Sequence, residues 1–128
     1  MTVQNTAVRG FLLALVVAVV AACAETPEAL ITSAKEYLGK GDAKAAVIQL
    51  KNALQKNPDI AEARFLLGRA LLDTRDILAA EKELRRALEL SYPSDEVVPP
   101  LVHAMVAGGQ YKSAIDEFGF SSTCTRRL

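Results

Sequence analysis

Few side chains in this 128-residue chain could carry out covalent or metal chemistry. The only thiols are Cys23 and Cys124, and His103 is the only histidine. A lone histidine cannot form a His-based metal cluster or pass protons to a second histidine. We find no glycine-rich phosphate loop, nucleophile elbow or metal-ligand spacing. We therefore expect no catalytic residue, metal site, cofactor or small-molecule substrate.

Cys23 directly follows an apolar run. No residue from Gly10 to Ala22 is charged, which gives thirteen apolar or small positions after Arg9. A helix that spans a membrane needs about 20 such residues, since each adds only ~1.5 Å of rise. A cationic start, a short apolar run and small residues at its end are typical of a secretory leader. We therefore predict that residues 1–22 are a signal peptide.

The residues Val20-Ala21-Ala22-Cys23 resemble a bacterial lipobox. The resemblance implies a diacylglyceryl group on the Cys23 thiol, cleavage before Cys23 and acylation of the new amino terminus. Two or more acyl chains anchor a protein stably, whereas one chain anchors it marginally. In this family Ala24, rather than Asp, after the cysteine implies transfer to the outer membrane, with the domain facing the periplasm. The alternative is an ordinary leader followed by a buried cysteine.

Composition narrows the remaining function classes. Without residues 1–22, the chain carries 14 basic and 15 acidic side chains and no Trp. A net charge near −1 gives no reason to expect nucleic acid as a partner. Once Cys23 is lipidated, Cys124 cannot form an internal disulfide, so the fold must be held by packing alone.

The chain contains a 34-residue repeat, and this repeat predicts the helices that position its side chains. Ala46, Ala80 and Ala114 share one register column. Four further columns have the same period: Leu50, Leu84 and Phe118; Ala53, Ala87 and Ser121; Tyr37, Leu71 and Met105; Gly41, Arg75 and Gly109.

In the second copy, apolar stripes predict helices over about 61–74 and 77–90. Gly68 and Ala80 should let the two backbones approach, with Leu84 beside them. The first helix of each pair should end at a residue with left-handed backbone, which glycine adopts easily, as at Gly41 and Gly109. Arg75 occupies this position in the middle copy, at a strain cost of about 1 kcal/mol. Pro58 and Pro93 mark the joints between pairs, and Asn57 and Asp59 are assigned turn and capping roles. We expect Glu81 and Arg85 to form a charge pair on the solvated face. Lys82, Glu83 and Asp116-Glu117 are likewise expected to be solvated charges.

This pattern resembles the tetratricopeptide repeat (TPR) over Pro27 to about Ser121. The resemblance implies an all-α solenoid of about three helix-turn-helix repeats, whose first helices line a concave groove that binds other proteins or peptides. The predicted division is 1–22 signal peptide, 23–26 lipidated tether, 27–121 TPR domain (27–60, 61–94 and 95–121) and 122–128 irregular tail. The predicted packing residues are Ala46, Leu50, Ala53, Gly68, Ala80, Leu84, Ala87, Ala114 and Phe118.

In the TPR family the groove is lined by four positions of each first helix. Carried over in register, these are Glu28, Ile31, Lys35 and Leu38; Glu62, Phe65, Arg69 and Leu72; Glu96, Pro99, His103 and Val106. Lys35, Arg69 and His103 then form a basic column that could pair with an acidic peptide or polysaccharide group. The alternative is that the glutamates favour the helix dipole and that the basic side chains are simply solvated.

A narrower resemblance is carried by the lipobox followed at once by "AKEYLGKGDAKAAVIQLKNALQKNPDIAEARFLLGRALL". It is similar to the PrsT family of TPR lipoproteins associated with bacterial exosortase (PEP-CTERM) and exopolysaccharide loci. Members of that family are much longer. Because "GFSSTCTRRL" abandons the repeat period after Phe118, we expect a truncated or frameshifted chain, with a natural polar cap as the alternative.

Three functions follow as hypotheses. The first is a lipid-anchored interaction scaffold of the cell envelope, tied to exopolysaccharide export and exosortase sorting. The second is a TPR lipoprotein of another envelope machine, such as outer-membrane protein assembly. The third is an enzyme whose catalytic domain is lost beyond residue 128, although the residues themselves indicate no enzyme. A non-functional truncated fragment is a further alternative.

Overall fold

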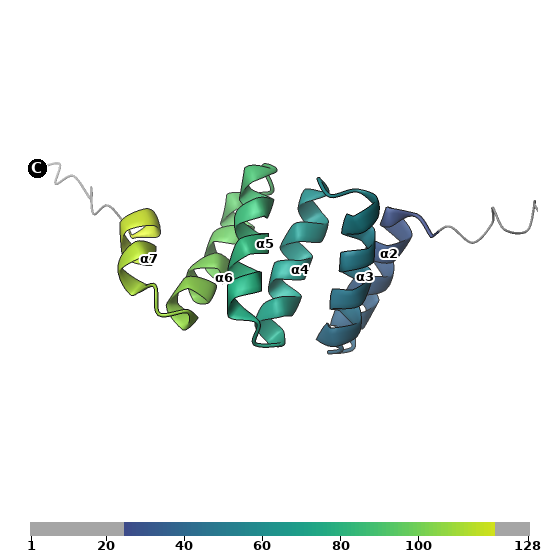
Figure 1. Cartoon of the computed structure of the whole chain (residues 1–128), viewed down its shortest axis with the longest axis horizontal. Helices are drawn as coiled ribbons and strands as arrows, with labels where there is room; N and C mark the ends of the chain where they lie inside the picture. Colours follow the sequence, from purple (N-terminus) through teal and green to yellow (C-terminus); the bar gives the residue numbers. More distant parts are fainter. Residues whose placement is uncertain (1–24, 120–128) are drawn as a thin grey trace, which may run out of the picture.

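The computed structural model describes residues 25–119, and these residues form six α-helices and no strand. The helices follow one another in chain order along the long axis of the molecule (Figure 1). The all-α prediction is confirmed. Residues 1–22, Cys23 and residues 122–128 lie outside the described part. The helices are α2 (Pro27–Gly39), α3 (Ala43–Lys56), α4 (Ala61–Asp73), α5 (Ile77–Glu89), α6 (Ser94–Ala107) and α7 (Tyr111–Phe118).

Each first helix ends in the same turn. Gly41, Arg75 and Gly109 have φ of 77°, 65° and 80°, so the predicted left-handed column is confirmed. The amide of the next residue donates back to the carbonyl five residues earlier, at 2.9 Å from Asp42 to Tyr37 and from Asp76 to Leu71. This pairing is the Schellman motif, which satisfies carbonyls that the helix end would otherwise leave free.

Side-chain caps start three of the helices. Thr26 accepts from the amide of Ala29 at 3.2 Å, and Pro27 follows it at the first helical position of α2. Asp42 and Asp76 cap α3 and α5 by accepting from Ala45 and Ala79 at 3.0 and 3.4 Å. A left-handed residue followed by a capping aspartate therefore closes one helix and opens the next.

Small side chains bring paired helices together in the core. Leu50 and Leu84 are fully buried, as are Ala46, Ala53, Ala80 and Ala87, while Ala114 is 5% exposed. A Cβ on Gly68 would lie 2.5 Å from Leu84 Cγ and 3.3 Å from the Ala80 carbonyl oxygen. No side chain larger than glycine fits there without movement of the Leu84 side chain or of α5.

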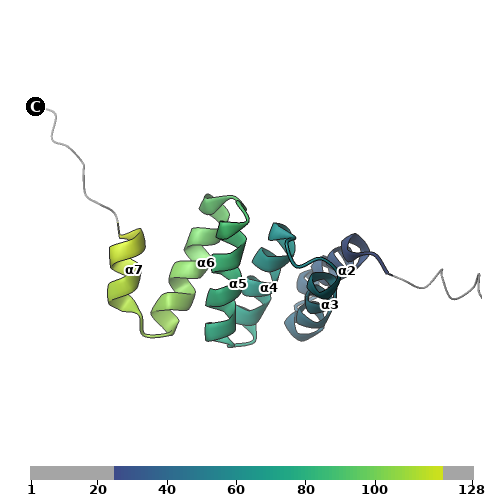
Figure 2. The same ribbon diagram turned by 45° about the horizontal axis from the view of Figure 1, so that its top comes forward.

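The six helices form two layers. Each helix packs against its chain neighbours, and α4 also contacts α2 and α6. The views in Figures 1 and 2 show α3 and α5 beside these helices, and within residues 25–119 α3 does not contact α5. The first helices of the pairs are therefore closer together than the second helices, which makes the α2–α4–α6 face the inner face. Among the described helices none is long and apolar enough to cross a bilayer.

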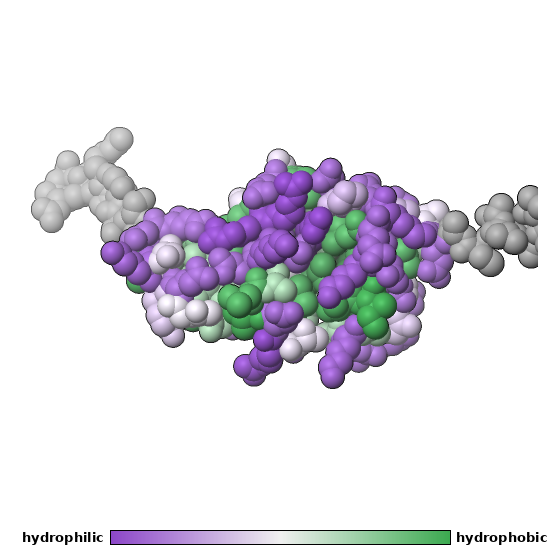
Figure 3. Space-filling model, in the orientation of Figure 1, coloured by the Kyte–Doolittle hydropathy of each residue, from purple (hydrophilic) through white to green (hydrophobic). Residues whose placement is uncertain are grey.

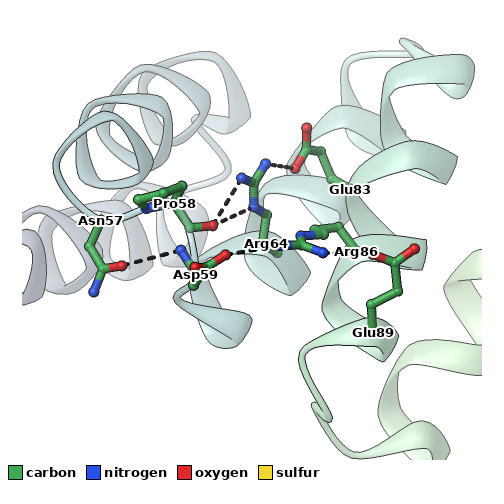
Figure 4. A network of polar contacts seen from close by, with 7 residues as sticks. All are labelled: Asn57, Pro58, Asp59, Arg64, Glu83, Arg86 and Glu89. Atoms are coloured by element: carbon green, nitrogen blue, oxygen red, sulfur yellow. Dashed lines mark hydrogen bonds and ion pairs between the residues drawn. The ribbon is translucent and has the colours of Figure 1, made fainter.

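The first joint corrects the role predicted for Asp59. The residue that precedes α4 is Ile60, and it makes no side-chain capping bond. Asp59 instead receives a hydrogen bond from Arg86 at 3.0 Å, while its own amide donates to Asn57 Oδ1 at 3.2 Å (Figure 4). The prediction of a cap is wrong because Ile60 occupies the N-cap position, which leaves Asp59 one residue too early, and its carboxylate pairs with Arg86 instead.

The same joint corrects the expected solvation of the α5 charges. Arg64 donates to the Pro58 carbonyl at 2.9 and 3.1 Å and to Glu83 at 2.6 Å (Figure 4). The Glu83 side chain is only 14% exposed. Arg64 therefore ties the joint, α4 and α5 together.

A matching cluster joins the second and third pairs. Arg85 donates to Glu81 at 3.0 Å and to both oxygens of Glu117, at 2.7 and 3.0 Å. Gln110 donates to Glu81 at 2.6 Å. The predicted Glu81–Arg85 pair is confirmed, but the Glu81 side chain is 14% exposed, so the prediction of solvated charge is wrong for Glu81 as well as for Glu83. Glu81 is held between repeats by Gln110, whereas Glu83 is held within the second pair by Arg64, and both partners come from distant positions in the sequence.

Candidate functional site

The predicted groove positions lie on α2, α4 and α6, the three helices of the inner face. Lys35, Arg69 and His103 are exposed, and Leu38 and Leu72 beside them are half-buried. Of the other positions, Glu28, Glu96, Pro99 and Val106 are exposed, Glu62 is half-buried, and Ile31 and Phe65 are buried. The face therefore offers a basic column with aliphatic side chains next to it.

One member of the basic column is already paired within the protein. Lys35 Nζ lies 2.7 Å from Glu62 Oε1, and the two side chains are 51% and 43% exposed. An ion pair this exposed contributes at most about 1 kcal/mol, so an incoming carboxylate can compete with Glu62. The pair links α2 to α4 across the inner face.

Aromatic packing fixes the second member. The Arg69 guanidinium lies 5.7 Å from the centre of the Phe65 ring, and Phe65 in turn stacks on Tyr92 with ring centres 4.7 Å apart. Phe65 is 5% exposed, so its ring lies in the core and supports Arg69 from below. A cation held over a ring in this way loses less side-chain freedom when it binds an anion.

Tyr92 is a site residue that sequence reasoning missed. It lies in the joint before α6, and its stacking on Phe65 carries it to the inner face. Burial raises the pKa of Tyr92 above its ordinary value, and the nearby carboxylates of Glu96 and Glu62 raise it further. The hydroxyl is therefore protonated at neutral pH and can donate a hydrogen bond. The signal in the sequence was an aromatic residue at a joint, in a chain with few aromatics.

The third helix pair contributes a different surface. His103 is exposed on α6, and within residues 25–119 neither His103 nor Arg69 forms an ion pair with a carboxylate.

Pro99 and Pro100 lie inside α6, which continues through them because Val97, Leu101 and Met105 are fully buried. The proline nitrogens cannot donate, so the first turn of α6 keeps carbonyls without helical partners.

The exposed groups on this face are suited to binding another molecule. The described residues contain no group of three or more His, Cys, Asp or Glu side chains placed to hold a metal ion. The opposite face is formed by α3 and α5 and is turned toward the viewer in Figure 3. It is covered mostly by hydrophilic side chains, with smaller apolar patches. Exposed cations beside aliphatic side chains suit an extended acidic peptide, because the cations can pair with its carboxylates and the aliphatic side chains can pack against its apolar atoms.

Comparison with known proteins gives two matches. The profile of a family described as "Tetratricopeptide repeat" matches residues 31–95, about half of the chain. A curated protein, the ALBINO3-like protein 2, chloroplastic, of Arabidopsis thaliana, is 28% identical over 89 residues. That alignment covers 70% of this chain but only 17% of the relative, so the chain spans a small part of the length of the protein it matches.

Proposed function

The chain belongs to the tetratricopeptide repeat family and is thus a protein–protein interaction scaffold, and we propose that it works from a lipid anchor in the bacterial cell envelope. In this proposal Cys23 carries the acyl chains, and the inner face of α2, α4 and α6 binds an acidic segment of an envelope protein. The lipobox resemblance supports the anchor, and the exposed basic column supports the choice of ligand.

The observation that carries the ligand class is the state of Arg69. Its guanidinium is exposed, rests on Phe65 and forms no ion pair with the described carboxylates. Because Lys35 and His103 lie one repeat away on either side, an extended acidic chain could pair with each in turn. Peptide recognition by several weak charge contacts gives specificity and fast association more than high affinity.

A peptide titration tests this ligand class. The probe is a short Glu-rich peptide with a fluorescent label, titrated with the soluble chain that begins after residue 23. We expect Arg69→Glu to weaken binding about tenfold or more, and added salt to weaken binding to the unmodified chain. Lys82→Glu is the matched control, because Lys82 is an exposed cation on α5 of the outer face and should leave binding unchanged. Equal loss in both variants would show that only net charge matters.

A cell experiment tests the anchor and the pathway. We propose that the scaffold helps exopolysaccharide export and the sorting of PEP-CTERM proteins by exosortase. Deletion of the gene should then reduce secreted polysaccharide and leave sorting substrates unprocessed, and Cys23→Ala should fail to complement while losing palmitate labelling. A loss of outer-membrane proteins instead would favour the alternative envelope assembly machine. Full function of the unlabelled Cys23→Ala protein would refute the anchored scaffold.

A further inference from the structure

The outer face carries a stripe of exposed side chains along α3. Its members recur at helical spacing, and we call them the α3 stripe: Lys44, Ile48, Lys51 and Gln55. Ile48 is 59% exposed, whereas Ala46, Leu50 and Ala53 on the other side of the helix are fully buried. The α3 stripe therefore holds one large apolar side chain between two ammonium groups.

The described carboxylates do not neutralise the α3 stripe. The sequence of α3 contains three lysines and neither Asp nor Glu, whereas α5 contains three cations and three glutamates. Within residues 25–119 neither Lys44 nor Lys51 forms an ion pair. Glu83 borders the same small pocket as Lys51, but its carboxylate binds Arg64 at 2.6 Å. The outer face is thus positively charged over α3 and balanced over α5.

We propose that the α3 stripe lies on an anionic lipid surface. Lys44 and Lys51 would pair with lipid phosphates, and Ile48 would enter the boundary between headgroups and acyl chains. A lysine stem can bury its methylene groups at that boundary while its ammonium group stays beside the phosphates. The exposed isoleucine favours a bilayer over a nucleic acid, because the phosphate backbone of a duplex offers it no apolar layer.

The first described residues lie at one end of the same helix. Lys56, the last residue of α3, donates a hydrogen bond to the carbonyl oxygen of Glu25. An acyl anchor on Cys23, two residues earlier in the sequence, would bring this end of α3 toward the same bilayer. The charge and the exposed isoleucine of the α3 stripe belong to the folded domain, so the lipid contact does not depend on that anchor.

A bilayer at α3 would leave the inner face free. Helix α3 lies in the outer layer (Figure 1), whereas Lys35, Arg69 and His103 lie on α2, α4 and α6. The protein would then hold a lipid surface on one face and an acidic ligand on the other. The lipid contact is in this way a second interaction, beyond the function proposed above.

Vesicle co-sedimentation tests this contact with the soluble chain used for the peptide titration, which lacks acyl chains. The probes are vesicles of phosphatidylcholine with about one-third phosphatidylglycerol, and vesicles of phosphatidylcholine alone. We expect partition into the anionic vesicles to be at least about tenfold stronger, and added salt to reduce it. Lys44→Gln and Lys51→Gln should each weaken it about fivefold. Ile48→Ser should weaken it about fivefold without a change of charge.

Matched control variants lie on α7, which does not contact α3 within the described residues. Lys112→Gln removes an equally exposed cation, and Ile115→Ser removes an isoleucine that is 68% exposed. Both should leave partition into the anionic vesicles unchanged. Since all these side chains are exposed, every variant should keep the helical circular dichroism spectrum of the unmodified chain.

Several results would overturn the proposal. The first two are failure to bind anionic vesicles and equal partition into anionic and neutral vesicles. A loss of partition in the α7 variants as large as that in the α3 variants would show that only total charge and hydrophobicity matter. Tighter binding to a DNA duplex, unchanged by Ile48→Ser, would assign the lysines to nucleic acid. Lys44→Gln should leave the affinity for the acidic peptide unchanged, which separates failure of this proposal from failure of the proposed function.

Discussion

At the scale of single residues, the contact between Gly68 and Leu84 sets how closely α4 and α5 approach. Leu84 is fully buried, and its Cγ would lie only 2.5 Å from a Cβ at position 68. Since α5 also carries the joint contacts through Glu83, a shift of α5 would disturb both neighbouring pairs. The smallest residue in the repeat therefore controls its geometry.

Gly68→Ala should lower the free energy of unfolding by about 1–3 kcal/mol, because overpacking outweighs the better helix propensity of alanine. Gly39→Ala is the control, since a Cβ there meets nothing within 4 Å and Gly39 is also helical. Urea unfolding of the two variants measures the difference. Equal stability in both would contradict the close approach.

Two left-handed residues show where local reasoning works at this scale. The value of φ 65° at Arg75 followed from its column with Gly41 and Gly109, because the turn after each first helix is the same local structure. Ser91 has φ 63° and closes α5 in the same manner, but the repeat register did not predict it. The equivalent Asn57 is extended, so the two joints between pairs differ although their repeats align.

At the scale of elements, the ion pairs that cross between helices decide how pairs are joined. The Arg85 hydrogen bonds hold the pKa of Glu117 below its ordinary value, and Glu117 keeps the Arg85 pKa raised. A carboxyl whose pKa is lowered in the folded state adds stability above its unfolded pKa, about 4.3 for Glu, and loses it as pH falls through the folded pKa. The α5–α7 contact should therefore weaken in acid.

Glu117→Gln should cost about 0.2–1 kcal/mol near neutral pH, since the two side chains are 35% and 41% exposed and partly screened. The difference from the unmodified chain should shrink as pH falls below about 4.3. Urea unfolding over this pH range measures it. Asp116→Asn serves as control, because Asp116 is exposed and pairs with no described cation.

Helix α6 illustrates how packing overrides a local signal. Two consecutive prolines would by themselves favour a helix end near Glu96. The helix instead runs to Ala107, because Val97 before the prolines and Leu101 after them are both fully buried in the core. The repeat period predicted this helix, whereas proline chemistry alone would have broken it.

At the scale of the whole molecule, stability should decrease toward the end of the solenoid. In a repeat protein each pair is held by its neighbours, and α7 packs mainly on α6. Ile115 and Tyr111 on α7 are 68% and 60% exposed, whereas the core of α4 and α5 is covered on both sides. Because no other described helix covers this side of α7, we expect α7 to be the least stable described element.

Hydrogen exchange should show the fastest amide exchange in α7 and the slowest in α4 and α5. The strongest protection in α7 would contradict the order of stability expected from the repeats.

The sequence by itself determined the helical class, the approximate ends of the two helices of the second copy, the left-handed column and the small residues of the core. It could do so because the 34-residue period compares each position with its equivalents in neighbouring copies, and the turns and caps are local. Only the tertiary structure decided that Phe65 turns inward onto Tyr92, that Glu81 is held by Gln110 of the next pair and Glu83 by Arg64, and that an apolar groove lies beside α7. Those outcomes depend on which side chains from distant positions meet, and on which helix faces have a neighbour, and neither is written in any single repeat.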